Sequence, residues 1–147
     1  MNFSNQTIGL TSDHAGYELK EAVKKHLEAR NIQYRDFGTT SPDRCDYPDY
    51  ARLLADAISS KDLDMGIAIC GTGNGMAMTL NKYPTIRAGL AWNVEVARLV
   101  GSHNKANILV LPARFVTTAE AVAMIDVWLA TPFEGGRHQE RIDKISG

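Results

Sequence analysis

A thiol, a hydroxyl and three glycines stand together in this chain, directly after a short apolar run. The run at residues 65–69 leads into Cys70-Gly71-Thr72-Gly73-Asn74-Gly75. Glycines let backbone N–H groups approach a ligand closely, and a thiolate can act as a base or a nucleophile. A bare turn also uses glycine, but it requires neither a thiol nor a hydroxyl. The segment therefore predicts a ligand-binding loop.

Two interpretations of Cys70 and of Thr72 remain open at this point. At the start of the helix that follows its strand, Cys70 would have its pKa lowered by the helix dipole and would serve as a base or nucleophile. The alternative is a buried structural cysteine. Thr72 would either join the N–H groups of Gly71 to Gly75 in a cradle for an oxyanion or cap the helix. The adjoining glycines favour the chemical function.

The same loop resembles the start of a dinucleotide-binding fingerprint, with Gly71-Thr72-Gly73 as its first positions. The third fingerprint glycine would fall at Met76, and no acidic residue stands at the expected distance of about 20 residues. The Gly-Lys-Ser/Thr ending of a phosphate-binding P-loop is also missing. The sequence therefore argues against a nucleotide, and we expect no cofactor.

Two of the four histidines stand where an imidazole can reach a ligand. His14 follows Asp13 at a strand end, and His103 lies in a turn-like segment, so either can transfer a proton near neutral pH. His26 borders an apolar helix face and is a boundary residue. His138 is either an exposed neighbour of the preceding arginine or a ligand contact.

Three arginines near the end of the chain are candidates for binding a phosphate. Arg137 and Arg141 are four residues apart, so they share one face of a helix. Arg114 follows the last predicted strand, at the same edge as the loop. Together the three guanidinium groups would clamp a phosphate. For the pair on the helix alone, a solvated surface is the simpler interpretation.

Alternating strands and helices must position these groups. Helical spacing is clear in three apolar sets, and Thr117 with Glu120 forms a capping-box pattern before the third. The sets are Leu19, Ala22, Val23 and Leu27; Tyr50, Leu53, Leu54, Ala57 and Ile58; and Ala121, Met124, Ile125, Trp128 and Leu129. Strands are predicted at 7–11, 33–37, 65–70, 86–91 and 108–111, with short helices at 75–81 and 94–100 and a last polar helix after Gly135-Gly136.

Apolar strands separated by helices indicate an α/β protein, with a Rossmann-like, doubly wound five-stranded parallel sheet and helices on both faces. Ligands of such folds bind outside the carboxyl ends of the strands. Asp13-His14 and the loop from Cys70 to Gly75 both follow strands, so we expect them to share that edge.

Composition narrows the classes of partner. The 147 residues fit one domain, and the formal charge of -1 offers no footprint for nucleic acid. No apolar run approaches the roughly 20 residues that span a bilayer, and residues 1–6 lack the pattern of a signal peptide. We therefore expect a cytoplasmic protein that binds neither nucleic acid nor membrane.

Cys45 and Cys70 match no zinc-ligand spacing, so neither a disulfide nor a metal site is expected.

Several motifs in order along almost the whole chain resemble ribose 5-phosphate isomerase type B. They are Ser12-Asp13-His14-Ala15-Gly16, Asp46-Tyr47-Pro48, Ile69-Cys70-Gly71-Thr72-Gly73, Asn81-Lys82, His103-Asn104 and Gly135-Gly136-Arg137-His138. The resemblance implies a Rossmann-like sheet, catalysis without a metal, and a homodimer with shared active sites, or a tetramer made of two such dimers. It also implies that the single domain 1–147 ends in a helical segment, 135–147, that reaches the dimer partner.

The resemblance further implies a role for each site residue. Cys70 would move a proton between neighbouring sugar carbons through a cis-enediolate, Thr72 would stabilise the enediolate oxygen, and His103 would open the furanose ring. Substrate contacts would come from Asp13, His14, Tyr47, Gly71, Gly73, Asn74, Gly75 and Asn104. The phosphate would be bound by His14, Arg114, Arg137 and Arg141, the last two reaching across the dimer interface.

The expected reaction is the interconversion of D-ribose 5-phosphate and D-ribulose 5-phosphate. The chain departs from the family pattern at Gly101-Ser102, Lys105 and Pro112. The alternatives are therefore isomerisation of a related four- or six-carbon sugar phosphate, such as allose 6-phosphate, and a non-catalytic phosphosugar-binding or redox-sensing module.

Overall fold

A parallel sheet forms the centre of the molecule in the computed structural model, which describes residues 6–147. Residues 1–5 lie outside the described residues. They make up most of the segment 1–6, in which we predicted no signal peptide. In chain order the elements are β1 (Thr7–Ser12), α1 (Tyr17–Ala29), β2 (Gln33–Asp36), α2 (Tyr47–Ser59), β3 (Met65–Cys70), α3 (Asn74–Leu80), β4 (Ala88–Leu90), α4 (Val94–Ser102), β5 (Ile108–Pro112), α5 (Thr118–Ala130) and α6 (Arg137–Asp143).

The five strands lie in the order β2-β1-β3-β5-β4, and every pairing is parallel. Ser12 pairs with Ile69, and Cys70 pairs with Pro112, so β1, β3 and β5 end at one edge. These three strands are buried almost throughout, as expected for a sheet that is covered on both faces. The predicted fold class is confirmed.

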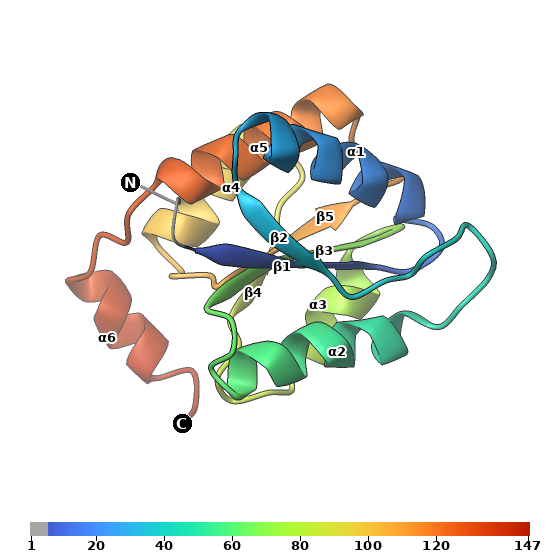
Figure 1. The fold of residues 1–147 in the computed structure, drawn as a ribbon. Coiled ribbons are helices and arrows are strands. Elements are labelled where there is room, and N and C mark those ends of the chain that lie inside the picture. Colours follow the sequence, from blue (N-terminus) through green and yellow to red (C-terminus); the bar gives the residue numbers. More distant parts are fainter. Residues whose placement is uncertain (1–5) are drawn as a thin grey trace.

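Helices cover the sheet in two layers (Figure 1). On one face α1, α4 and α5 bury a core that includes Val23, Val100 and Trp128. On the other face α2 and α3 enclose a second core around Leu54 and Met76. The predicted capping box is present at the start of α5, where Thr117 and Glu120 exchange side-chain to backbone hydrogen bonds. Local chemistry therefore sets the start of α5.

Three local expectations are wrong. The predicted strand 86–91 shrinks to Ala88–Leu90, because β4 is an edge strand that pairs with β5 alone. Leu53 shares the helical spacing of α2 but keeps 46% of its surface exposed, because the buried stripe lies on its neighbours. Cys70 does not begin a helix: it ends β3, and α3 starts only at Asn74.

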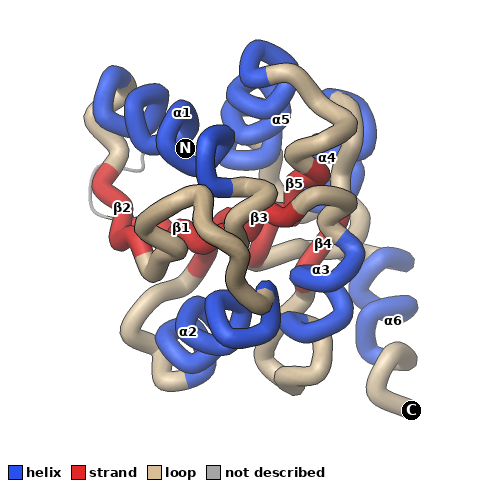
Figure 2. Tube along the Cα trace, turned by 90° about the vertical axis from the view of Figure 1, so that its right-hand side faces the viewer, coloured by secondary structure: helices blue, strands red, loops and turns tan. Residues whose placement is uncertain are grey.

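The last helix, α6, lies outside the two helical layers (Figure 2). It follows Gly135 and Gly136, both with positive φ, a conformation that glycine adopts without steric cost. Ile145, just after α6, lines a hollow together with Ala88 and Gly89 of the edge strand. None of the helices formed by residues 6–147 has the length and apolar character needed to cross a membrane.

Candidate active site

A hollow of about 230 Å³ opens at the carboxyl edge of the sheet, beside the ends of β1 and β3. The predicted neighbours Asp13-His14 and Cys70 to Gly75 do share this edge. Its lining consists of Asp13, His14, Ala15, Tyr47, Cys70, Gly71, Thr72, Gly75 and Arg114. Segments from four separate parts of the chain thus meet at one polar pocket, as the parallel topology requires.

Cys70 lies at the base of this hollow with 4% of its surface exposed. The backbone N–H groups of Gly73, Gly75 and Met76 donate hydrogen bonds to its sulfur and favour the thiolate. The left-handed conformation of Gly73, with φ of 80°, turns the chain so that successive N–H groups face inward. The loop therefore surrounds the sulfur with donors that stabilise its anionic form.

The pKa of Cys70 is nevertheless higher than that of an ordinary thiol, against our expectation from the sequence. Burial raises the pKa of Cys70, and the nearby Asp13 carboxylate raises it further, while the loop amides act in the opposite direction. Because three residues separate Cys70 from the start of α3, the thiol is not the first residue of a helix. Desolvation therefore outweighs the stabilisation from the backbone.

Asp13 and His14 are held in place by backbone groups. The buried Asp13 carboxylate accepts a hydrogen bond of 3.0 Å from the Gly16 N–H and thereby closes the turn that begins α1. His14 Nδ1 lies 3.2 Å from the backbone N and the backbone O of Cys45. The loop before α2 therefore orients the His14 imidazole toward the hollow. It does so through the Cys45 backbone, although no pattern in the sequence predicted a role for that residue.

Side chains pack directly over two glycines of the loop. A Cβ added to Gly75 would lie 2.5 Å from Cε1 of Tyr47. A Cβ added to Gly71 would lie 3.2 Å from the guanidinium carbon of Arg114, whose backbone N–H donates to the Gly71 carbonyl. Tyr47 and Arg114 therefore form two walls of the hollow. A larger residue at position 75 would collide with the Tyr47 ring.

Thr72 and Asn74 are exposed at the rim. Thr72 Oγ1 accepts a hydrogen bond of 3.3 Å from the Asn74 N–H, at the first residue of α3. The N-cap of α3 is Gly73, and α3 has no side-chain cap, so the helix-cap interpretation of Thr72 is wrong. Its hydroxyl also lines the hollow beside Cys70, so the contact with a ligand that we expected from the sequence is compatible with the same geometry.

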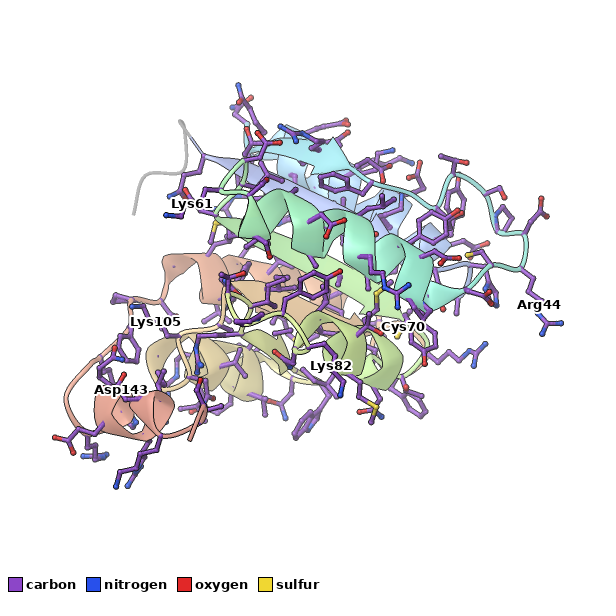
Figure 3. All side chains as sticks on the ribbon, turned by 90° about the horizontal axis from the view of Figure 1, so that it is seen from below. Arg44, Lys61, Cys70, Lys82, Lys105 and Asp143 are labelled. Atoms are coloured by element: carbon purple, nitrogen blue, oxygen red, sulfur yellow. The ribbon has the colours of Figure 1, made fainter. Side chains whose placement is uncertain are left out.

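The other predicted residues lie at the opposite edge of the sheet. His103 and Asn104 follow α4, which returns the chain to the amino end of β5. They line a second hollow, of about 400 Å³, together with Leu99, His138, Arg141, Ile142 and Ile145. Figure 3 shows Lys105 and Asp143 on the far side of the molecule from Cys70. Arg137 is exposed at the start of α6.

A clamp of Arg114, Arg137 and Arg141 within one chain is therefore wrong. Arg114 follows β5 at the carboxyl edge, whereas α6 carries the other two arginines at the amino edge. Among residues 6–147, none lines both hollows. We had expected the three arginines at one edge. Spacing along the chain does not show at which edge of the sheet a connection ends, so this expectation could not be checked from the sequence.

His138 is a buried contact and not an exposed neighbour, since only 6% of its surface is accessible. Its ring stacks on that of His103 with centroids 4.1 Å apart. The Glu134 carboxylate lies 3.2 Å from His138 Nε2 and 3.5 Å from His103 Nε2. We missed Glu134 in the sequence, although its spacing of four residues from His138 was available as a signal.

Arg87 is a second residue that we missed. Its guanidinium donates two hydrogen bonds, of 2.9 Å and 2.6 Å, to the Asn104 carbonyl. The Arg87 N–H is itself bonded to the side chain of Asn107. The turn that carries His103 and Asn104 is thus tied to the start of β4. No local pattern in the sequence indicates this contact, because the partners lie 17 residues apart.

The fold and the pocket together define a Rossmann-like α/β protein with a buried cysteine in a glycine-rich loop. The family model described as Ribose/Galactose Isomerase matches residues 8–145. The chain belongs to that family, and the resemblance inferred from the sequence motifs is confirmed.

Individual relatives agree with this assignment. The chain is 45% identical over 142 residues to a probable ribose-5-phosphate isomerase B of Mycoplasma pneumoniae, which covers 96% of this chain and 93% of the relative. A ribose 5-phosphate isomerase of Thermotoga maritima superimposes with a TM-score of 0.93 at 48% identity, covering 96% and 97%. Ribose-5-phosphate isomerase B of Mycoplasma genitalium with bound ribulose-5-phosphate gives 0.90 at 43% identity, covering 96% and 94%.

Proposed function

We propose that this protein is an aldose–ketose isomerase that interconverts D-ribose 5-phosphate and D-ribulose 5-phosphate. The observation that carries the proposal is the Cys70 thiol, buried in a polar hollow and surrounded by the N–H groups of its own loop. The similar Mycoplasma genitalium structure with bound ribulose-5-phosphate supports the choice of substrate. Buried titratable groups in such clefts are typical of active sites.

The proposed reaction moves one proton between neighbouring carbons. The Cys70 thiolate removes the proton from C2 of the open-chain aldose, and the electrons of that C–H bond form the C1–C2 double bond of a cis-enediolate. The same sulfur returns a proton to C1, while a proton passes from the C2 hydroxyl to the C1 oxygen to complete the ketose. No net oxidation or reduction takes place. The Thr72 hydroxyl and the loop N–H groups stabilise the negative oxygen.

The remaining roles combine the family resemblance with the lining of the hollow. Asp13, Tyr47 and the loop residues Gly71, Gly73, Asn74 and Gly75 hold the sugar beside Cys70. His14 and Arg114, which line the same hollow, bind its charged end. Guanidinium groups suit this task because they stay protonated and match phosphate oxygens in pairs.

Four further residues complete the site from a second copy of the chain in this proposal. His103 opens the furanose ring, Asn104 binds a hydroxyl, and Arg137 and Arg141 bind the phosphate. All four lie at the amino edge of the sheet, so in one chain they are separated from Cys70. A homodimer that brings the amino edge of one copy against the carboxyl edge of the other joins both halves.

An exposed apolar surface beside the pocket supports this dimer. Trp92 and Phe115 keep 55% and 69% of their surfaces exposed, and with Leu90 they line a hollow of about 450 Å³ that also includes Thr72. Exposed aromatic side chains next to a polar site are typical of protein interfaces. Burial of this surface against a second copy would also exclude water from the reaction.

Replacement of Cys70 by Ala tests the function. Loss of the base is expected to lower kcat by a factor on the order of 10²–10⁴, whereas calorimetry should still detect binding of ribose 5-phosphate. Cys45→Ala is the matched control, since that thiol lies outside the lining of the hollow. Retained turnover in Cys70→Ala would remove this residue from the mechanism.

The assay should include D-erythrose 4-phosphate and D-allose 6-phosphate. The proposal predicts the highest kcat/KM for ribose 5-phosphate. A higher value for either of the others would reassign the substrate. Binding of all three without any conversion would instead indicate a non-catalytic phosphosugar-binding module.

A further inference from the structure

Three potential metal ligands converge beside the second hollow, on segments distant from Cys70. His103 follows α4, Glu134 lies in the loop before α6, and His138 is in the first turn of α6. One ligand atom from each lies within 4.8 Å of the other two. They are the residues within 6–147 that come together in a manner suited to a metal ion. We had expected no metal site, because zinc-ligand spacings in a sequence are sought among cysteines and histidines.

The separations match those of a tetrahedral ion. Two ligand atoms that share Zn²⁺ at about 2.0–2.1 Å lie about 3.4 Å apart. The Glu134 oxygen is 3.2 Å from His138 Nε2 and 3.5 Å from His103 Nε2. Two edges of the tetrahedron are therefore already formed. The third edge, between the two histidine nitrogens, requires the half-exposed His103 ring to turn out of its stack on His138.

The surrounding contacts hold the ligands in place. The Glu134 N–H donates a hydrogen bond of 3.0 Å to the Ser102 carbonyl, which fixes the loop beside the residue that precedes His103. His138 is buried, so its ring has little freedom to move. The exposed Glu134 carboxylate supplies one negative charge and leaves a path for an ion to enter. A preorganised ligand set binds an ion with less ordering cost.

We propose that His103, Glu134 and His138 form a site for a first-row divalent transition metal ion, with Zn²⁺ as the best fit. Two imidazoles and one carboxylate are a common zinc ligand set, and a water molecule would fill the fourth position. Imidazole nitrogens exclude Mg²⁺ and Ca²⁺ as preferred occupants, because those ions select oxygen ligands. The binding of the ion does not depend on the isomerase activity.

The consequence for the enzyme rests on the proposed function. A metal-bound Nε2 of His103 cannot carry the proton that has to be donated to the ring oxygen, so it cannot assist ring opening. The bound ion would also hold His103 next to Glu134 and away from a sugar. Zn²⁺ is therefore an inhibitor, and the site makes the isomerase sensitive to free transition metal.

Direct binding measurements test the site without substrate. We expect the full-length chain to bind one Zn²⁺ by calorimetry and to give the intense visible bands of tetrahedral Co²⁺. Glu134→Gln should weaken binding by at least about tenfold, the loss that follows removal of even an outer-shell partner. The variant should fold, since Glu134 is exposed. The matched control is Glu140→Gln, an exposed carboxylate on α6 that should bind like the wild type.

Each result decides between the alternatives. Binding that is equal in Glu134→Gln and the wild type would overturn the site. So would a thiolate-to-cobalt charge-transfer band that disappears in Cys70→Ala, because the ion would then lie in the other hollow. In the activity assay, Zn²⁺ should inhibit the wild type more strongly than Glu134→Gln. Metal binding without inhibition would overturn only the claim that Zn²⁺ inhibits the enzyme. A chain that binds Zn²⁺ but has no isomerase turnover would contradict only the proposed function.

Discussion

Cys70 and His103 lie at opposite edges of one parallel sheet, although both belong to the set of residues that we expected in a single site. Cys70 ends β3, and His103 follows the helix that returns the chain to the start of β5. A strand and its return helix run in opposite directions, so residues at their carboxyl ends are separated by the length of the sheet. A catalytic site that needs both side chains must therefore combine two copies.

Mixed dimers test this arrangement. Cys70→Ala and His103→Ala should each be inactive as homodimers, but mixing and re-forming them in equal amounts should restore about a quarter of the wild-type activity. In an isologous dimer, half of the re-formed molecules are heterodimers, and each has one site without any substitution. The measurement is turnover after unfolding and refolding the mixture together.

Two controls accompany this experiment. Each variant refolded alone should remain inactive, and light scattering should give the mass of a dimer. Activity that stays at the level of the separate variants would contradict a site shared between copies. A fully active monomer would do the same.

The raised pKa of Cys70 predicts how activity depends on pH. Because burial and Asp13 favour the neutral thiol, kcat/KM should increase as the pH rises toward the pKa of the group. Asp13→Asn removes one of the two causes, so its profile should shift to lower pH even if its maximum rate falls. The measurement is kcat/KM against pH for both proteins.

Cys45→Ala serves as the control in that series and should keep the wild-type profile. A profile of Asp13→Asn that coincides with that of the wild type would show that the carboxylate does not act on the sulfur. A rate independent of pH would argue against Cys70 as the base.

Gly75→Ala should damage the pocket through crowding. The added methyl group would lie 2.5 Å from the Tyr47 ring, so either the ring or the loop must move. Overpacking of this kind costs typically about 1–3 kcal/mol of stability, and displacement of Tyr47 should raise KM for the sugar phosphate. Urea unfolding and steady-state kinetics measure the two effects.

Gly101→Ala is a suitable comparison for this substitution. Its added Cβ would approach no atom closer than 3.4 Å, an ordinary contact distance, and Gly101 lies inside α4, where Ala is the better helix former. It should unfold at the same or a higher urea concentration. If Gly75→Ala and Gly101→Ala had the same stability and the same KM, the close packing of Tyr47 on Gly75 would not matter for function.

Sequence periodicity was sufficient for the fold because it reports local burial. The apolar spacing of Ala121, Met124 and Ile125 and the capping box at Thr117 both persist in the structure, since each depends on residues within one or two helical turns. Expectations failed where a neighbouring element decided the outcome. Leu53 is exposed because the buried stripe of α2 lies on its neighbours, and the edge strand β4 is short because it pairs with β5 alone among the strands of residues 6–147.

The same distinction between local and long-range contacts applies to the residues of the candidate site. Cys70, the glycines after it and Asp13-His14 could be assigned to one edge from the sequence, because all parallel strands end at the same side. Arg87 could not be found, since its contact with Asn104 joins segments 17 residues apart. The spacing of four residues between Glu134 and His138 is a local signal, but only the folded chain brings the two next to His103. The pKa of Cys70 was misjudged because burial is a property of the packed molecule.

The sequence by itself therefore determined the strands, the helices, the family and the chemical groups, because these depend on residue type and on spacing over a few residues. The tertiary structure decided which of those groups meet. It separated Cys70 from His103, stacked His103 on His138 beside Glu134, and buried the Cys70 thiol deeply enough to raise its pKa. The physical reason is that distances between segments and the exclusion of water arise only when the helices pack against both faces of the sheet.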